Sequence, residues 1–450
     1  MTLLREVLRR FDKRMLRSPG TCVRYGTKLF TARGRAELRG LMGLAQAKGA
    51  PPVPYCDPFP NLMPPPLREV PGQRRLSVFL PSLQMRHMSG GPNTAILLAL
   101  RLHDACKIPL RFVSTDMPLE SDATLHRHFE ELTETDLPRK DITSVAIADR
   151  NLPFELGSEE VILATAWWTA QPAHRILART KRPRPYLYLV QEFEPGLYPW
   201  SSEYALAEET YAHDIRPIVN EQTVLDFLVE RRQGRFAEAD FVRDHCVAFE
   251  PALDVRKFHP GDVGTRPGKK RLLFYARPTA PRNLYQLGLA ALKDAIEADA
   301  FPLAEWEICF MGEKIPDLEL GKGHVIRTLP WQSFDGYAAN LRACDAGLSL
   351  MLSPHTSYPP LEMAACGVPC VTTSYATKTA QRLVEVSPNL IPAIPDRGHL
   401  AFALREAWVR SQDLERRKKD AHVSWPRSWN AAFDPILPRI VKTIRAIGGW

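Results

Sequence analysis

The sequence predicts an α/β protein made of two doubly wound, Rossmann-like domains that face a central cleft. Its 450 residues suit two domains of about 200 residues better than one. Short apolar segments alternate with helical patterns, which is typical of parallel sheets covered by helices. This alternation stops near residue 260 and then starts again, so we predict one domain on each side of that point. In such sheets ligands bind at the carboxyl ends of the strands.

The first domain is predicted at 75–260 and the second at 261–426. Strand candidates of the first are 75–82, 108–114, 142–148, 161–166 and 186–190. Those of the second are 270–276, 307–312, 324–329, 346–352 and 370–373. The last segment, 427–450, has apolar residues at helical spacing and is expected to pack back on the first domain.

Residues 1–74 are predicted to be a basic amphipathic helix followed by a proline-rich connector. The apolar residues recur at helical spacing in the first twenty positions, among many basic ones: Leu4, Val7, Leu8, Phe11 and Met15. Such a helix is typical of a membrane-surface element, and the alternative is an ordinary helix packed on the first domain. The prolines of 50–71 indicate an extended connector. We therefore expect a cytoplasmic protein at the inner face of the cytoplasmic membrane.

The composition favours an anionic partner. The net charge is +8 and the pI is about 9.0, which suits a nucleotide diphosphate or an anionic lipid surface. No zinc-finger spacing and no basic run with interleaved aromatic residues occurs, so we expect no nucleic-acid partner. No apolar run is long enough to span a membrane. The eight cysteines include no CxxC pair, which indicates buried thiols in a reducing compartment.

The segment from Ser353 to Thr373 predicts a ligand site. Two prolines precede a short apolar helix expected to begin near Leu361, whose free amides favour anions. Glu362 lies in the first turn, and its carboxylate could accept both hydroxyls of a ribose or sugar diol. Alternatively, it only complements the helix dipole. We take Ser357, Tyr358 and Glu362 as candidate donor-binding residues.

A second candidate site follows the first strand of the second domain. Arg277 comes directly after this strand, and Arg282 stands at the entry to the next helix. Two guanidiniums at a strand end could clamp a diphosphate in bidentate fashion. Solvated surface arginines are the alternative, but the F-Y-A before Arg277 is typical of a buried strand.

These motifs together resemble the GT-B glycosyltransferases of the glycogen-synthase-like kind (family four). The run P-L-E-M-A-A-C-G-V-P-C-V, from Pro360 to Val371, matches the family's helix motif. Arg277 falls on the family's arginine, and Arg282 replaces its lysine. The run from Pro251 to Pro260 looks like the family's interdomain motif. The resemblance implies a GT-B fold, nucleotide-sugar chemistry and no metal cofactor, since such enzymes neutralise the diphosphate with basic side chains and helix termini.

Finer details are similar to bacterial rhamnosyltransferases of the WsaF type, from about 75 to 430. They include S-G-G-P-N-T from Ser89, Q-E-F-E-P-G-L-Y from Gln191, and the R-P-T-A-P-R-N version of the clamp. This resemblance implies dTDP-L-rhamnose as donor and a growing surface glycan, of O-antigen or S-layer type and lipid-linked, as acceptor. The family's nucleobase site falls at Trp331. Where the family has another acidic residue, eight positions before Glu362, this chain has Pro354.

The first domain is expected to carry the acceptor and the catalytic groups. The loop with Gly90, Gly91 and Asn93 opens a helix and would let backbone amides approach a sugar or phosphate; a plain tight turn is the alternative. Glu192 and Glu194 follow a strand, as does Asp116. We expect one of these three carboxylates to act as general base if the reaction inverts, although each could be a solvated surface group. The family's histidine at this strand end is here Gln191.

Two other functions fit the sequence. One is a different GT-B reaction on a sugar nucleotide, such as epimerisation. The other is a non-catalytic GT-B module that binds glycan or nucleotide within a polysaccharide synthesis complex, which Pro354 favours. The sequence leaves the acceptor, the linkage and the stereochemistry open.

Overall fold

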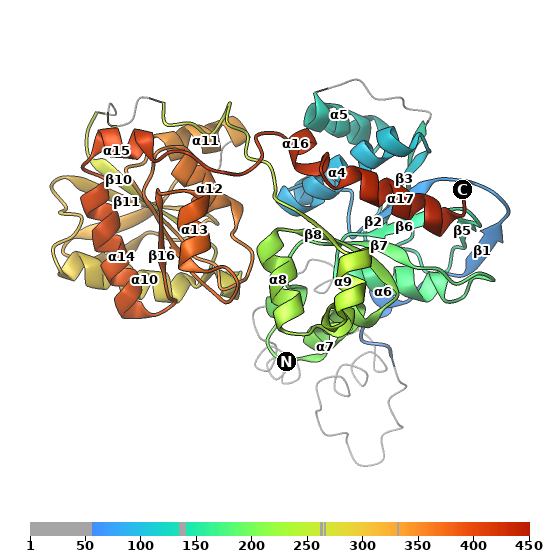
Figure 1. Cartoon of the computed structure of the whole chain (residues 1–450). Helices are drawn as coiled ribbons and strands as arrows, with labels where there is room; N and C mark the ends of the chain where they lie inside the picture. The colour runs from blue at the N-terminus through green and yellow to red at the C-terminus, as the bar shows by residue number, and fades with distance from the viewer. Residues whose placement is uncertain (1–55, 135–140, 262–263, 265–266, 331–332) are drawn as a thin grey trace, which may run out of the picture. The chain divides into compact units, whose positions relative to one another are not determined.

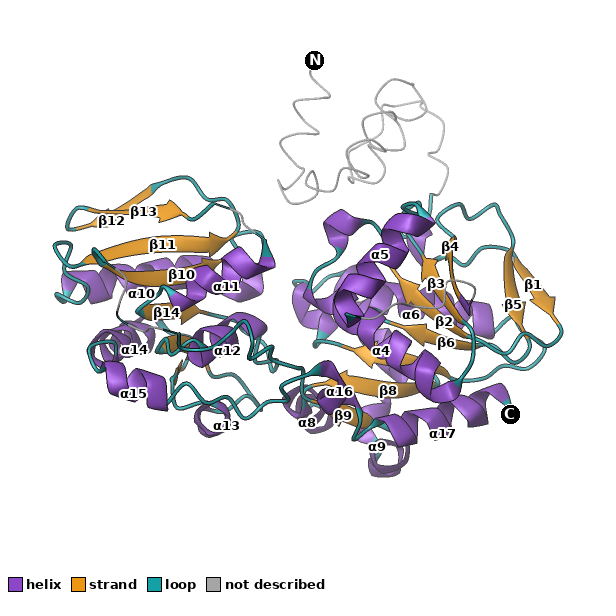
Figure 2. Ribbon diagram, turned by 90° about the horizontal axis from the view of Figure 1, so that it is seen from above, coloured by secondary structure: helices purple, strands orange, loops and turns teal. Residues whose placement is uncertain are grey.

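The computed structural model describes residues 56–134, 141–261, 264, 267–330 and 333–450. The chain divides into two compact units, Met1–Pro60 and Asn61–Trp450. The predicted amphipathic helix of residues 1–20 and Trp331 lie outside the described residues. The second unit holds two α/β lobes, each built on a seven-stranded sheet (Figures 1 and 2). The predicted fold class is confirmed.

The sheet of the N-terminal lobe has the order β4-β3-β2-β6-β7-β8-β9, and all its strands are parallel. Its strands are β2 (Leu76–Leu80), β3 (Leu110–Ser114), β4 (Ile142–Ala146), β6 (Val161–Ala164), β7 (Tyr186–Val190), β8 (Ile215–Asn220) and β9 (Val247–Phe249). Its helices are α4 (Gly90–Cys106), α5 (Asp122–Thr133), α6 (Trp167–Leu177), α7 (Ser202–Glu209), α8 (Gln222–Glu230) and α9 (Ala239–His245).

The sheet of the C-terminal lobe has the order β12-β13-β11-β10-β14-β15-β16, with only β12 antiparallel to its neighbour. Its strands are β10 (Lys270–Ala276), β11 (Trp306–Gly312), β12 (Leu318–Gly321), β13 (His324–Thr328), β14 (Ala346–Ser349), β15 (Cys370–Thr373) and β16 (Leu390–Ala393). Its helices are α10 (Tyr285–Glu297), α11 (Phe334–Arg342), α12 (Tyr358–Ala365), α13 (Ala380–Val386), α14 (Arg397–Arg410) and α15 (Leu414–Lys419).

Central strands are buried on both faces because helices cover both sides of each sheet. In β2, Val78 and Phe79 are both fully buried, but they belong to different apolar clusters. In β10, Leu273 and Phe274 divide in the same way. Successive side chains of a strand point to opposite faces, so each sheet has one core above it and one below. This explains why the predicted strands are continuous apolar runs.

Several strands were not predicted. Strand β8 contains Arg216 and Pro217, which interrupt its apolar pattern, and β9, β12 and β16 are only three or four residues long. The prediction of a connector through residue 71 is wrong at its end. Leu67–Val70 forms strand β1, which pairs in parallel with β5 (Phe154–Gly157). Long-range pairing of this kind leaves little trace in local composition.

The C-terminal segment forms two helices, α16 (Trp429–Phe433) and α17 (Leu437–Gly448), rather than one. Pro435 lies in the break between them and cannot continue the first helix. Ile440, Ile444 and Ile447 recur along one face of α17 and join the apolar cluster that includes Leu98 of α4. The end of the chain thus completes the core of the N-terminal lobe. In the part of the chain that the structure describes, no helix has both the length and the apolar character needed to cross a bilayer.

Candidate functional site

The candidate site is built from segments that follow the carboxyl ends of strands in both lobes. From the C-terminal lobe come the residues after β10 and the segment 350–357 between β14 and α12. From the N-terminal lobe come the residues after β7 and β8. Hydrogen bonds from Ser353 to Glu192 and from Thr356 to Glu221 join the two sets. Parallel sheets place their ligand sites at these strand ends.

Arg277 and Arg282 follow β10 and differ in environment. The Arg277 side chain is 43% exposed, and its Nε lies 3.6 Å from Oε1 of Glu313. Arg282 belongs to the short 3-10 helix Pro281–Asn283, and its buried Nε has no hydrogen-bond partner among the described residues. Burial lowers the pKa of Arg282, whereas the nearby carboxylate of Glu192 raises it. A buried guanidinium donor without a partner is costly, and an anionic ligand would satisfy it.

Glu192 reaches the C-terminal lobe from the end of β7. Its Oε1 accepts hydrogen bonds from Ser353 Oγ and, at 2.9 Å, from the backbone N–H of Phe193. Burial raises the pKa of Glu192, and the hydrogen bond from Ser353 and the charge of Arg282 act against this rise. The structure therefore brings a predicted catalytic carboxylate near a predicted clamp arginine, next to Pro354.

Glu362 lies on α12, but this helix begins earlier than predicted, at Tyr358 instead of near Leu361. Pro359 and Pro360 occupy the first turn, where a missing N–H costs no helix hydrogen bond. Glu362 is consequently the fifth helical residue. Its Oε2 accepts a hydrogen bond from the hydroxyl of Tyr337 on α11, and burial raises its pKa to about 7.

Glu194 is placed differently from the prediction. We expected either a general base or a solvated surface group, but only 4% of the residue is exposed. Its Oε2 accepts hydrogen bonds of 2.6 Å from the backbone N–H of Trp167 and from the hydroxyl of Tyr188. Burial raises its pKa to about 8. The reason is the 3-10 helix Glu194–Leu197, which turns the chain back toward the lobe's core. Glu194 thus ties α6 to β7.

The predicted glycine loop opens helix α4, as expected. A Cβ atom on Gly90 would lie 3.6 Å from the ring of Tyr358, and one on Gly91 would lie 3.2 Å from Oε1 of Gln191. Tyr358 also places its hydroxyl 3.5 Å from Thr94 Oγ1. Asn93 instead contacts Nε2 of His128 within its own lobe, at 3.0 Å. Gly91 therefore allows this loop to lie close to Gln191, whereas a Cβ atom on Gly90 would make only ordinary contact with Tyr358.

Asp116 follows β3 and is partly buried. Its Oδ1 lies 3.8 Å from the guanidinium of Arg150, and burial raises its pKa to about 6. No contact between Asp116 and the residues around Ser353 is recorded in the described part of the chain. The structure thus joins only Glu192, among the three predicted carboxylates, to the C-terminal lobe.

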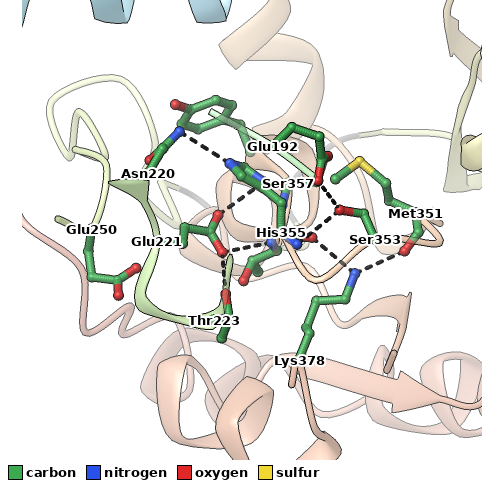
Figure 3. A network of polar contacts seen from close by, with 12 residues as sticks. Glu192, Asn220, Glu221, Thr223, Glu250, Met351, Ser353, His355, Ser357 and Lys378 are labelled. Atoms are coloured by element: carbon green, nitrogen blue, oxygen red, sulfur yellow. Dashed lines mark hydrogen bonds and ion pairs between the residues drawn. The ribbon is translucent and has the colours of Figure 1, made fainter. Parts of the chain in front are cut away.

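A buried polar network between the lobes was not predicted from the sequence (Figure 3). Oε1 of Glu221 lies 3.0 Å from Nδ1 of His355, whose Nε2 lies 3.3 Å from Nδ2 of Asn220. Nζ of Lys378 donates to the carbonyls of Met351, at 2.9 Å, and of His355, at 3.1 Å. Burial raises the pKa of Glu221 to about 8 and lowers those of His355 to about 3 and Lys378 to about 8.

Ser357 ends the same segment with a backbone φ of +75° and provides no side-chain cap to α12. Its N–H donates to Nδ1 of His355, at 2.9 Å. The described residues contain no group of three or more His, Cys, Asp or Glu side chains placed to hold a metal ion.

Two α/β lobes with ligand-binding side chains at their strand ends define the GT-B class of glycosyltransferase fold. Solved structures of this class match most of the chain. HepE from Anabaena in complex with UDP-glucose is 14% identical, covers 83% of this chain and 98% of its own, and gives a TM-score of 0.53. Sucrose-phosphate synthase from Thermosynechococcus elongatus is 11% identical, covers 84% and 99%, and gives 0.51. These likenesses show the fold, and the predicted GT-B fold is confirmed.

The chain belongs to the WsaF family. The model of the WsaF N-terminal domain matches residues 75–223, and that of the WsaF C-terminal domain matches residues 270–405. The O-antigen biosynthesis protein RfbC of Myxococcus xanthus is 31% identical over 289 residues. That stretch is 63% of this chain but only 21% of RfbC, so the chain spans about a fifth of that relative's length.

Proposed function

We propose that the protein transfers a sugar, L-rhamnose from dTDP-L-rhamnose, onto a growing bacterial surface glycan. Membership of the WsaF family and the likeness to an O-antigen biosynthesis protein support the polysaccharide context. The observation that carries the proposal is the buried Nε of Arg282, which has no hydrogen-bond partner among the described residues and lies near Arg277 and Glu192. This arrangement provides anion-binding groups and a candidate base in one place.

The arginines would act on the diphosphate of the donor. Arg282 supplies the buried donor, and Arg277 supplies a second, more exposed guanidinium that would exchange its contact with Glu313 for a phosphate oxygen. Hydrogen bonds to charged groups contribute about 1.5–3 kcal/mol each. Charge that develops on the leaving diphosphate would be stabilised by the same two side chains, so the reaction needs no metal ion. Glu362, held by Tyr337, would bind the ribose hydroxyls.

Glu192 would act on the acceptor. In the transfer, the bond between the sugar C1 and the diphosphate oxygen breaks, and the acceptor oxygen bonds to C1. If the configuration inverts, Glu192 takes the proton of the acceptor hydroxyl. A buried carboxylate with a raised pKa is a stronger base than a solvated one. If the configuration is retained, Glu192 lies where it could orient the donor sugar instead, near Arg282.

The choice of rhamnose as the transferred sugar is supported by the family resemblance and by one local observation. The position at which related enzymes have an acidic residue is Pro354, which is buried. A 6-deoxysugar has no 6-hydroxyl, so a less polar surface at this position suits it. HepE has the same fold, but its structure was solved with UDP-glucose, which is a different nucleotide sugar from the donor proposed here.

The test is a transfer assay with a panel of donors. The full chain is incubated with a rhamnose-terminated acceptor and, in parallel, dTDP-rhamnose, dTDP-glucose, UDP-glucose or GDP-mannose. Mass spectrometry should show the mass gain of one deoxyhexose only with dTDP-rhamnose. A gain with another donor would correct the sugar, and conversion of the donor without transfer would instead indicate epimerisation.

A non-catalytic module is the second candidate. Pro354 favours it, because one acidic residue found in related enzymes is missing. Binding of dTDP without any transfer or donor conversion, across several glycan acceptors, would support this candidate.

A lipid-linked acceptor would also give residues 1–20 a purpose as a membrane-surface helix. Deletion of residues 1–20 should abolish sedimentation with anionic liposomes at low salt and spare transfer to a soluble acceptor. Full sedimentation of the truncated protein would assign membrane contact elsewhere.

A further inference from the structure

The segment Met351–Ser357 leads directly into α12, and several of its backbone groups form hydrogen bonds with residues outside both the segment and α12 (Figure 3). From the N-terminal lobe, Glu221 accepts a 2.8 Å hydrogen bond from the backbone N–H of Thr356. From the C-terminal lobe, Lys378 donates to the carbonyls of Met351 and His355. Most of the segment is buried, so each of these backbone groups needs a partner in the protein.

Glu221 is the most constrained of these partners. Only 1% of the residue is exposed, and its backbone has a φ of +76°, which is unfavourable for a residue with a side chain. Glu221 precedes α8, yet its side chain does not cap that helix. Its Oε2 accepts from Thr356 and from the hydroxyl of Thr223, at 3.1 Å, while Oε1 faces His355.

The other end of the contact has the same backbone feature. Ser357, at the start of α12, has a φ of +75°, and its N–H donates to His355. Two non-glycine residues with positive φ, one in each lobe, therefore lie at this contact: Glu221 itself and Ser357, two residues after His355. Such conformations are unfavourable and persist only where surrounding contacts impose them. They are common at sites that position a ligand or a catalytic group.

We infer that Glu221 is a positioning residue, through which the N-terminal lobe fixes the segment Met351–Ser357 and the first turn of α12. This inference rests on the proposed function in one respect, namely that α12 binds the nucleotide through Glu362. Glu221 itself touches neither the arginines nor Glu362 in any recorded contact among the described residues. Its effect on donor binding would pass through Thr356 and His355.

The test compares Glu221→Ala with two matched variants of the full chain. Glu221→Gln keeps the size and an oxygen that accepts from Thr356, so it should behave as the wild type does. Glu238→Ala removes another acidic side chain of the same lobe, one that is 60% exposed, pairs with Arg235 and has no recorded contact with Met351–Ser357 among the described residues. Glu221→Asp keeps the carboxyl group on a shorter side chain and serves if the alanine variant does not fold.

Hydrogen exchange followed by mass spectrometry gives a readout without catalysis. In Glu221→Ala, amides of the peptide 351–362 should exchange about 10-fold faster or more, because Thr356 loses its buried acceptor. Peptides from β7 and β10 should be unchanged, and Glu221→Gln and Glu238→Ala should match the wild type. Unchanged exchange in 351–362 in both Glu221→Ala and Glu221→Asp, or an equal increase throughout the chain, overturns the inference.

Titration with dTDP separates this inference from the proposed function. Glu221→Ala should bind dTDP about 10-fold more weakly, and Glu221→Gln should bind it normally. If the wild type binds no dTDP but the peptide 351–362 still responds, the donor assignment fails and the positioning role stands. If dTDP binding is normal in Glu221→Ala despite faster exchange, the segment does not control the nucleotide site, and the inference is wrong.

Discussion

The charged side chains at the strand ends of the two lobes differ in how far the protein itself satisfies their hydrogen bonds. At the acidic edge, Glu192 and Glu194 after β7, both carboxylates have hydrogen bonds within the protein. At the basic edge, Arg277 and Arg282 after β10, one guanidinium is half-exposed and the other has a buried donor without a partner among the described residues. The acidic edge thus has its hydrogen bonds within the protein, whereas the basic edge keeps a guanidinium donor that an anion could bind.

The same comparison separates two neighbouring glutamates. Glu194 bonds only groups of its own lobe and stabilises the fold, whereas Glu192 bonds Ser353 of the other lobe. A charged residue near a strand end is therefore not a site residue by position alone. The partners of its oxygens decide between a structural and a functional role.

The largest loss of dTDP affinity is expected from substitutions at the basic edge. Arg282→Ala should weaken dTDP binding about 10- to 100-fold, because a charge-assisted hydrogen bond of about 1.5–3 kcal/mol is lost. Arg277→Ala should act at the lower end of this range, because its side chain is more exposed. Calorimetric titration measures both. The control is Arg327→Ala, whose side chain is 74% exposed and pairs with Asp317 on the surface. Equal affinity in the wild type and in both clamp variants would remove the clamp from the account.

A smaller and more selective effect is expected at Glu362. Glu362→Gln should lower the affinity for dTDP about 10-fold, because the amide replaces one of the acceptor oxygens that bind the ribose hydroxyls. Affinity for inorganic diphosphate should hardly change, because the arginines are intact. Tyr337→Phe is the companion variant, since it frees Oε2 of Glu362 without removing the carboxylate. Equal losses for dTDP and diphosphate would show that Glu362 does not recognise the ribose.

At the acidic edge, Glu194 should affect stability and leave binding unchanged. Its pKa of about 8 in the folded protein exceeds the unfolded value of about 4.3, so the folded state binds the proton more tightly. The resulting stabilisation is complete below about pH 4 and is lost as the pH rises through about 8. Glu194→Gln cannot ionise, so its free energy of unfolding should fall less than that of the wild type between pH 5 and 8.

Urea unfolding at a series of pH values checks this prediction, and dTDP titration of the same variant at pH 7 is its control. Glu221, with a folded pKa of about 8, contributes in the same direction, so the variant should retain part of the pH dependence. Parallel stability curves for the wild type and Glu194→Gln, or a loss of dTDP affinity in the variant, would contradict the structural role.

Local patterns predicted the fold well, and they predicted that Arg277 and Arg282 follow a strand and that Glu362 lies near a helix start, because buried parallel strands and a proline-led helix start leave clear signals. The start of α12 was misplaced by three residues, since Pro359 and Pro360 belong inside the first turn rather than before it. The burial of Glu194 depends on a short 3-10 helix that has no strong sequence pattern.

The contact between Glu221 and His355 could not be predicted from local patterns at all. These residues are far apart in the sequence, and each stands where a loop residue or a helix cap would be expected. Their pairing follows from the association of the two lobes, which periodicity and motif spacing do not describe. Side chains that complete each other across lobes are therefore found only once the tertiary structure is available.

The central claim is that a nucleoside diphosphate occupies the basic edge and is read by α12. A crystal structure of the full chain with dTDP tests this most directly. We expect the diphosphate within hydrogen-bond distance of the Arg277 and Arg282 guanidiniums, including Arg282 Nε, with the ribose hydroxyls on the carboxylate of Glu362. A nucleotide bound at the Gly90–Gly91 loop or elsewhere, with the Arg282 donor still unpartnered, would contradict it.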